Sequence, residues 1–374
     1  MVVGRCNQSV VTDFARDTFC LFGLVFDRSS TEKTIGWVRG VGRAAQTSGR
    51  SVGLNWVSMD LTRLMAVQTH ENLRAALLKS DHCTIGSRWI LRLANKLALH
   101  PGTRVSQSQV VSGLSAGPLS TDPLGSVVVA ADGAIADRVT TTMSKDGSGL
   151  EVLDVITPGY LPLAQLNHQG WMDTINQSQP DVMSVSLGET KGQIWLATQK
   201  HRLRCGVSFV FDDRWVCDED VKSRLARWFR QPMAMIQASK EGRFYVSVVR
   251  QYYRQWPLLD TAYLCRSKGD WKRRTIDGMC EVTLPTHVGD KLVASGRRFW
   301  PEVLASESVQ RITINCLECQ SMSSEAMAQL LLLAKHAGQR FLDVELVHVN
   351  PTLLAQFKVN DLLASLSALN VHVD

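Results

Sequence analysis

The strongest constraint on the fold is an alternation of short apolar runs with amphipathic helical patterns over the first two-thirds of the chain. The run Gly125–Gly133 (GSVVVAADG) precedes the helical pattern AIADRVTTTMSK, and Gln179–Gly188 and Cys205–Phe211 are similar apolar runs. The run Phe19–Phe26 is also strand-like. Short buried strands alternating with helices indicate a parallel sheet covered on both faces. We therefore expect an α/β fold with a Rossmann-like parallel sheet.

Ligands of such sheets bind at the carboxyl ends of the strands, where helix N-termini present backbone N–H groups to anions. Three turns are expected at such ends, and in the last of them a helix is expected to begin at Gln193. Polar and glycine residues in these turns are candidate ligand-binding residues: Asn55, Asp132, Gly133, Gly188, Lys191 and Gln193.

The length of 374 residues predicts more than one domain. From Cys280 a new alternation of strand and helix patterns begins, which indicates a second, smaller α/β domain. We assign residues 1–262 to the first domain, 263–279 to a charged linker and 280–374 to the second domain.

The segment 222–256 combines many basic residues with aromatic ones and contains a single acid, Glu241. Such a composition suits a solvated basic face or the interface of an anionic membrane. No base-stacking motif accompanies it, so nucleic acid is an unlikely partner. The candidate membrane or partner residues are Arg224, Arg227, Arg243, Arg250 and Arg254.

Composition limits the remaining classes. Nine scattered cysteines and no long apolar run predict a cytoplasmic protein, with attachment to the inner face of the membrane as an extension of that prediction. Cys316 and Cys319 form a C-x-x-C, but on a predicted strand they would point to opposite faces. We therefore expect no metal site and no cofactor.

Ordered motifs from about Phe19 to Tyr253 resemble the WecG/TagA/CpsF glycosyltransferase family. CLFGLVFD is similar to the opening strand of that family, TRVSQSQVV to its R-V-T-G-S-D segment, QPDVMSVSLGETKGQIWLATQKHRL to its block around P-K-Q-E, and RLARWF to its R-A-P-R-W segment. The resemblance implies transfer of an N-acetylmannosamine-type sugar from a UDP donor to a lipid-linked acceptor.

The polar residues of that family are largely replaced. Ile85 stands where the family has the aspartate proposed as its base, and Asp81 and His82 are the nearest side chains that could substitute. Arg104, Lys191 and Trp195 persist. The other departures lie in the same motifs: Gly53 for threonine, Gln107 and Gln109 for glycine and aspartate, and Thr190, Gly192 and Gln193 for proline, glutamine and glutamate.

The segment Val282–Leu366 resembles the STAS domain of anti-sigma-factor antagonists and anion transporters, which implies docking of a protein partner. Ser323 matches the serine phosphorylated in regulated members, but Met322 replaces the aspartate before it and Glu325 replaces a glycine. Ser323 is also placed to cap the helix that follows, and we favour this role.

Three hypotheses follow. The leading one is a non-catalytic scaffold or regulator of cell-surface polysaccharide synthesis that docks partners through its STAS-like domain. The alternative is an active UDP-N-acetylhexosamine transferase with a lipid-linked acceptor and a site rebuilt around Asp81, His82, Arg104 and Lys191. A nucleic-acid-binding protein is the third and weakest.

Overall fold

A computed structural model describes residues 11–48, 53–116, 123–143, 149–166, 169–211, 243–244, 246–247 and 271–374. Contacts within the chain divide it into two units. The six-stranded unit comprises Ser29–Leu91 and Gly102–Phe244, and the five-stranded unit comprises Met1–Arg28, Arg92–Pro101 and Tyr245–Asp374. Each is described by itself.

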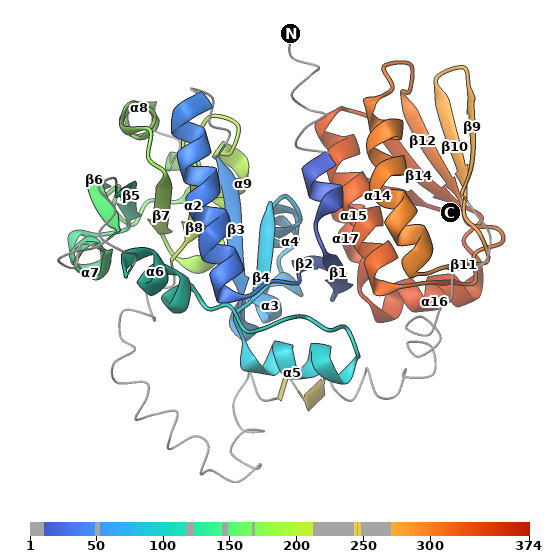
Figure 1. The fold of residues 1–374 in the computed structure, drawn as a ribbon, viewed down its shortest axis with the longest axis horizontal. Helices are drawn as coiled ribbons and strands as arrows, with labels where there is room; N and C mark the ends of the chain where they lie inside the picture. Colours follow the sequence, from blue (N-terminus) through green and yellow to red (C-terminus); the bar gives the residue numbers. More distant parts are fainter. Residues whose placement is uncertain are drawn as a thin grey trace. The chain divides into compact units, whose positions relative to one another are not determined.

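The six-stranded unit contains a parallel sheet with the strand order β4-β3-β8-β7-β5-β6 (Figure 1). This confirms the expected parallel α/β sheet. The strands are β3 (Leu54–Met59), β4 (His82–Ile85), β5 (Leu124–Ala130), β6 (Leu150–Ile156), β7 (Val182–Ser186) and β8 (Val207–Val210).

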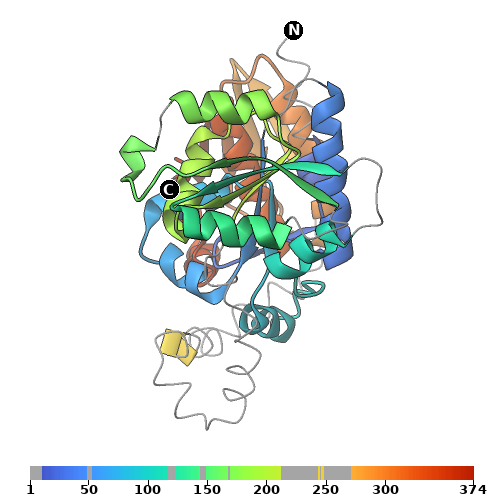
Figure 2. The ribbon, with the colours of Figure 1, turned by 90° about the vertical axis from the view of Figure 1, so that its left-hand side faces the viewer.

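Helices lie on both faces of this sheet, as Figure 2 shows. They follow the strands in the order that the sequence pattern predicts, because each connection between parallel strands crosses one face. The helices are α2 (Thr31–Ser48), α3 (Leu61–Val67), α4 (Glu71–Leu78), α6 (Gln107–Ser115), α7 (Gly133–Met143), the 3₁₀ turn η1 (Leu163–Gln165), α8 (Gln169–Ser178) and α9 (Glu189–Gln199), while α5 (Arg88–Lys96) connects the two units.

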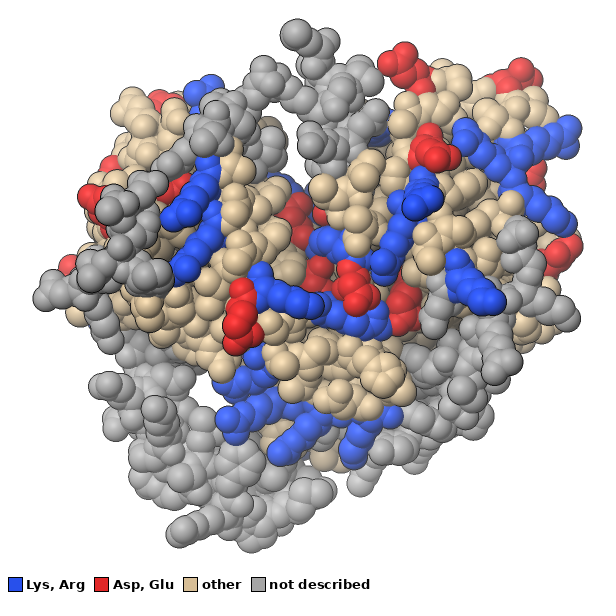
Figure 3. All heavy atoms as spheres, in the orientation of Figure 1, with Lys and Arg blue, Asp and Glu red and all other residues tan. Residues whose placement is uncertain are grey.

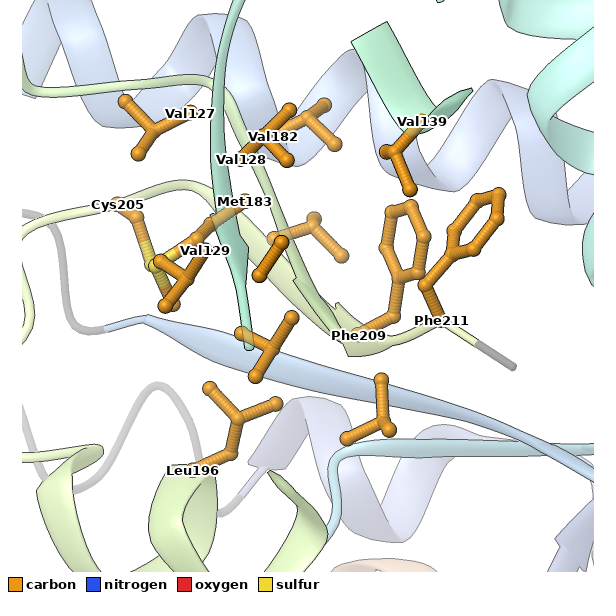
Figure 4. Packing of buried hydrophobic residues seen from close by; sticks show 14 of the residues in the cluster. Val127, Val128, Val129, Val139, Val182, Met183, Leu196, Cys205, Phe209 and Phe211 are labelled. Atoms are coloured by element: carbon orange, nitrogen blue, oxygen red, sulfur yellow. The ribbon is translucent and has the colours of Figure 1, made fainter. Parts of the chain in front are cut away.

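The core of the six-stranded unit lies on the two faces of the central strands (Figure 4). All seven residues of β5 are buried, as expected for a strand of a parallel sheet whose two faces are both covered by helices. The Trp56 ring meets Phe209 edge to face, with 5.4 Å between the ring centroids. This packing fixes β3 against β8 and so fixes the positions of the loops that follow them.

The five-stranded unit has the strand order β15-β14-β12-β10-β9, in which only β9 is antiparallel to its neighbour. Buried and partly exposed positions alternate in β10, β12 and β14, which is typical of a sheet covered on one face. Its strands are β9 (Lys272–Ile276), β10 (Met279–Thr283), β12 (Arg311–Asn315), β14 (Asp343–Val347) and β15 (His372–Val373), with a separate pair β11 (His287–Val288) and β13 (Ser321–Met322).

Its helices are α14 (Asp290–Ala305), α15 (Ser324–Gln339), α16 (Pro351–Val359) and α17 (Leu362–Ala368). The alternation of strands and helices expected after Cys280 is present in this unit.

The expected linker differs from the structure in its second half, because residues 272–276 form strand β9. β9 and β10 form a hairpin through Asp277 and Gly278, whose φ angles are 48° and 78°. Asp-Gly is the residue pair that a two-residue turn with positive φ favours. The sequence therefore contained a hairpin signal that the charge of this stretch obscured.

The apolar run near the N-terminus is a hairpin rather than one strand. β1 (Thr18–Leu21) pairs with β2 (Leu24–Asp27), and Phe22 and Gly23 form the turn with φ angles of 56° and 69°. A Cβ on Gly23 would lie 2.4 Å from the carbonyl oxygen of Asp361, so this close approach requires glycine. The hairpin belongs to the five-stranded unit, whereas the sequence placed it in the first domain.

Candidate functional site

The carboxyl ends of the six parallel strands are the place where a ligand is expected. Asp60 directly follows β3, and Gly86 directly follows β4. One residue separates Asp132 from the end of β5, and one separates Gly188 from the end of β7. The turns at Asp132–Gly133 and at Gly188 therefore lie where the sequence placed them. We call this side of the sheet the carboxyl edge.

Asn55 does not lie at the carboxyl edge, and the expectation that it does is wrong. It is the second residue of β3 and pairs with Ser208 of β8, at the amino end of both strands. Its backbone N–H donates to Asp81 Oδ2 at 2.8 Å. Asn55 and Ser58 are polar, but both are buried within a paired strand. Neither of them therefore marks a loop.

Asp81 and His82 also lie at the amino end, at the start of β4. Asp81 forms an ion pair with Lys200, and the His82 ring stacks on Trp37 with 4.7 Å between centroids. A strand of four residues is about 13 Å long. Arg104 belongs to the other end, since the N–H of the next residue donates to the Ile85 carbonyl at 2.8 Å. The rebuilt site is therefore not brought together.

Ile85, which the resemblance matches to the family's proposed base, lies in an apolar and closed place. Ile85 is the last residue of β4 and is 2% exposed. A Cβ on Gly86 would lie 2.4 Å from Ser58 Oγ, which itself donates to the carbonyl of Val105 at 2.8 Å. The backbone of this turn is thus held against β3 with no room for a larger side chain.

A buried ion pair joins the segments that follow β3 and β7. Arg63 of α3 is 1% exposed, and its Nε lies 3.0 Å from Glu189 Oε1 at the start of α9. Its Nη1 donates to the Ser58 carbonyl at 2.8 Å. Sequence reasoning missed Arg63; the available signal was an arginine inside the otherwise apolar helical pattern DLTRLMAV. β8 lies between β3 and β7, so the pair connects the two flanks of β8.

Gln107 contacts the carboxyl end of β8 directly. It is the first residue of α6, and its amide nitrogen donates to the Val210 carbonyl. Ser106 caps α6 and forms a capping box with Gln109, which holds the helix start in place. The side chain that the resemblance matches to a glycine of the family motif therefore contacts the last residue of β8.

Helix α9 begins at Glu189, four residues earlier than expected, directly after Gly188 with φ of 86°. Lys191 Nζ donates to the Leu161 carbonyl at 2.9 Å, and Trp195 Nε1 donates to the Leu166 carbonyl at 3.0 Å. Gln193 is fully buried, and neither its amide oxygen nor its amide nitrogen has a hydrogen-bond partner in the described part of the chain.

One comparison with known proteins decides the family. The profile of the glycosyl transferase WecG/TagA/CpsF family matches residues 19–214, which is more than half of the chain. The chain belongs to the WecG/TagA/CpsF glycosyltransferase family. The match indicates a glycosyltransferase-like role in cell-surface polysaccharide synthesis. A search of curated proteins returned no match to the chain.

Asp132 caps α7 in this WecG/TagA/CpsF-family sheet. Its Oδ1 accepts from the N–H of Ile135 at 2.8 Å, and its Oδ2 accepts from the Tyr160 hydroxyl. The hydrogen bond from Tyr160, followed by that from Ile135, lowers the pKa of Asp132 below its ordinary value. A carboxylate with a lowered pKa is a weaker base, so Asp132 is poorly suited to remove a proton.

The remaining candidate residues, outside this sheet, differ in exposure, and some of them lie outside the described residues. Arg243 is exposed, whereas Arg224, Arg227, Arg250 and Arg254 lie outside the described residues. Ser323 caps α15 by accepting from the Ala326 N–H at 3.2 Å and is 4% exposed.

Cys316 and Cys319 lie in a turn after β12 rather than on a strand. The sequence prediction placed these cysteines on the strand because they are apolar and continue its pattern of buried residues. The strand β12 itself ends at Asn315. Both are buried, and burial raises the pKa of Cys316 to about 12. Within the described ranges no group of three or more His, Cys, Asp or Glu side chains is placed to hold a metal ion. No described helix is long and apolar enough to span a membrane.

Proposed function

We propose that this chain is a non-catalytic member of the WecG/TagA/CpsF family that serves as a scaffold or regulator in cell-surface polysaccharide synthesis. The observation that carries the proposal is that side chains of the chain itself make contacts at the carboxyl end of β8 and between the segments beside it. Gln107 bonds the Val210 carbonyl there, and the Arg63–Glu189 pair joins the segments on both sides.

The chemistry of the carboxyl edge supports this reading. Deprotonation of a sugar hydroxyl requires a base within hydrogen-bond reach. In the described part of this edge, Asp60 caps α3, Asp132 caps α7 and Glu189 faces Arg63, so each carboxylate already has a structural partner. Ile85 cannot accept a proton.

The charge balance at this edge supports it as well. A UDP donor carries a diphosphate, whose binding needs uncompensated positive charge or free backbone N–H groups. The buried Arg63 is neutralised by Glu189 of the same chain. Breaking such a buried pair costs about 3–5 kcal/mol, so a donor would have to supply at least that compensation.

We further propose that the five-stranded unit is STAS-like and docks a protein partner. Its strand order, with one antiparallel edge strand and α15 beginning directly after Ser323, supports this proposal. Since Ser323 is buried and caps α15, we assign it a structural role rather than phosphorylation.

The test is calorimetric titration with UDP and UDP-N-acetylhexosamines, combined with a donor-turnover assay. We expect no turnover and no binding by the native protein. Gln107→Gly should uncover the end of β8 and produce measurable UDP binding. Gln169→Gly is the matched control, because Gln169 is also the first residue of a helix and is exposed. Turnover by the native protein would contradict the proposal.

An active transferase with a UDP-sugar donor and a lipid-linked acceptor is the second candidate. The buried Gln193 amide favours it, because a buried unpaired amide costs about 1–3 kcal/mol and a bound ligand would supply partners. If turnover is observed, Asp212 and Asp213, which follow β8 in the chain and lie outside the described residues, are the first carboxylates to replace by Asn.

A further inference from the structure

We propose that strand β9 is a docking edge for an extended acidic segment of a partner protein, which adds a further strand to the five-stranded sheet. This inference rests on the proposal that the five-stranded unit docks a protein, and it names the surface and the chemistry of the segment that binds there. In the described part of the chain β9 is the last strand of its sheet, so one of its two sides has no neighbouring strand.

The pairing of the hairpin determines which main-chain groups β9 presents to a partner. Ile276 and Met279 flank the two-residue turn, and residues in that position exchange both of their main-chain hydrogen bonds. Because the two kinds of pair alternate, Thr275 and Arg273 direct their N–H and C=O groups away from β10, where no described strand lies. Such outward groups are the ones with which an added strand pairs.

The side chains of β9 give this edge its chemical character. Lys272, Arg274 and Ile276 share one face of the strand, and all three are exposed. Ile276 pairs with Met279, and the two are 41% and 39% exposed, so an apolar contact is open at this end of β9. Figure 3 shows Lys and Arg side chains gathered over β9 at the right-hand edge of the view. A strand with acids opposite the two basic residues and an aliphatic side chain opposite Ile276 is complementary to this face.

The two basic side chains on this face form no ion pair within the described residues. Glu281 lies opposite Arg274 on β10, but Glu281 Oε1 accepts from Asn315 Nδ2 of β12 at 3.2 Å. Lys272 lies opposite Thr283, which carries no charge. Both positive charges are therefore available to acids on an added strand, where opposite charges on neighbouring strands stabilise the pairing.

The same charges disfavour a second copy of this chain as the occupant. Lys and Arg on an edge strand prevent association of sheets, because like charges on facing strands repel each other. Two copies of β9 paired antiparallel about Arg274 would place the two Arg274 side chains opposite each other. An acidic strand meets no such repulsion, so the residues that exclude self-pairing also select the partner.

Strand β6, an edge of the six-stranded sheet, shows by contrast how an edge of this chain is protected. The N–H of Val155 donates to Oδ1 of the adjacent Asp154 at 2.8 Å, and the register with β5 shifts between Ser126 and Val127. Bulges of this kind disrupt an edge as a template for pairing. The register of β9 with β10 is regular over all five pairs, so β9 remains a suitable template.

The test is fluorescence anisotropy of the full-length protein with the labelled peptide Thr-Val-Thr-Glu-Thr-Glu-Thr. Paired antiparallel to β9, its valine lies opposite Ile276 and its two glutamates lie opposite Arg274 and Lys272. We expect this peptide to bind and its counterpart with lysines in place of the glutamates not to bind. Since binding requires main-chain pairing, N-methylation of the two threonines that flank the first glutamate should abolish it, because their N–H groups face β9. N-methylation of the two glutamates, whose N–H groups face solvent, should preserve it.

Variants of the protein test the same contact from the other side. K272E/R274E should bind the acidic peptide about tenfold more weakly or worse, because two favourable cross-strand pairs become repulsive. K291E/R298E is the matched control, with the same change in net charge at exposed residues of α14, and should bind as the native protein does. Thr275→Pro removes an outward N–H without a change in charge and should also abolish binding, since edge strands accept proline where the N–H faces solvent. Thermal melting of each variant checks that the fold is kept.

Equal binding of the two N-methylated peptides, or equal losses in the two double variants, would mean that charge alone acts and would overturn the inference. Loss of binding only in K291E/R298E would keep docking by the five-stranded unit but move it away from β9. A native dimer that Thr275→Pro dissociates would assign the edge to a second copy and overturn the inference as well. The titrations with UDP do not involve β9, so the proposed lack of catalysis stands or fails separately.

Discussion

The Ser324 hydroxyl forms hydrogen bonds with both the backbone N–H and the backbone carbonyl of Cys20, although the two residues are 304 positions apart in the chain. The Cys20 N–H donates to Ser324 Oγ at 3.0 Å, and the Ser324 hydroxyl donates to the Cys20 carbonyl at 2.7 Å. One hydroxyl thus joins β1 to the first turn of α15. The arrangement shows that the N-terminal hairpin is part of the five-stranded unit.

Ser324→Ala should destabilise the five-stranded unit. Both polar groups of Cys20 would lose this partner in a buried place, which costs about 1–3 kcal/mol. Ser308→Ala, at an exposed serine of the same unit, should change stability by less than about 0.5 kcal/mol. Urea unfolding of the two variants measures the difference, and equal midpoints would show that the Cys20 contact contributes nothing.

Residues 271–374 expressed without the N-terminal hairpin should not form a fully packed domain. Phe19, Leu21 and Phe26 are each fully buried, and their absence would expose apolar surface on α15. We expect strong binding of a hydrophobic dye and a broad melting transition. A separate peptide of residues 11–28 should sharpen the transition and lower dye binding. A cooperative transition without the peptide would contradict this prediction.

Asp13→Asn should lower stability at neutral pH. Asp13 Oδ2 lies 3.0 Å from Lys335 Nζ and 2.9 Å from His336 Nε2, and the Lys335 side chain is 2% exposed. Burial alone would raise the pKa of Asp13, but Lys335 and Arg16 hold it well below the ordinary carboxyl value. Loss of the carboxylate removes the negative charge that faces the buried ammonium of Lys335, and breaking such a buried ion pair costs about 3 kcal/mol or more.

The pH dependence follows from the sign of this shift. A carboxyl whose pKa is lower in the folded state stabilises fully above its unfolded pKa and loses this effect as the pH falls toward the folded pKa. The stability gap between the native protein and Asp13→Asn should therefore narrow below about pH 4. Asp17→Asn, at a carboxylate whose side chain is 60% exposed, is the control. A gap that is constant with pH would rule out the ion pair as its cause.

Gln193→Met should leave stability unchanged or raise it. The replacement has similar length and removes a buried amide for which the described residues provide no partner. Gln199→Met on the same helix should be destabilising, because Gln199 is also buried and its Oε1 accepts from Arg202 at 3.2 Å. Denaturant titration compares them. A large destabilisation by Gln193→Met would indicate a bound partner at this amide and would favour an active site over a closed one.

How far the sequence predicted the molecule depends on the range of the interactions involved. The apolar runs of β5, β7 and β8 and the helical patterns of α7 and α15 were readable because strand and helix periodicity report local burial. The Asp277–Gly278 turn was equally local and could have been found. The boundaries expected near Asn55 and Gln193 could not be found in this way, because a buried polar residue inside a strand, as Asn55 is, or inside a helix, as Gln193 is, resembles one in a loop.

Sequence by itself determined a parallel α/β sheet and a second α/β unit, and its resemblance to the family predicted that Ile85 stands in place of the proposed base. Only the tertiary structure decided which polar residues meet at the carboxyl edge. Gln107 and Val210 are 103 residues apart, and Arg63 meets Glu189 across the position of β8. Such contacts depend on strand order and on the packing of helices from distant segments, and no local pattern encodes them. Strand order is what brings these polar residues together at one end of the sheet.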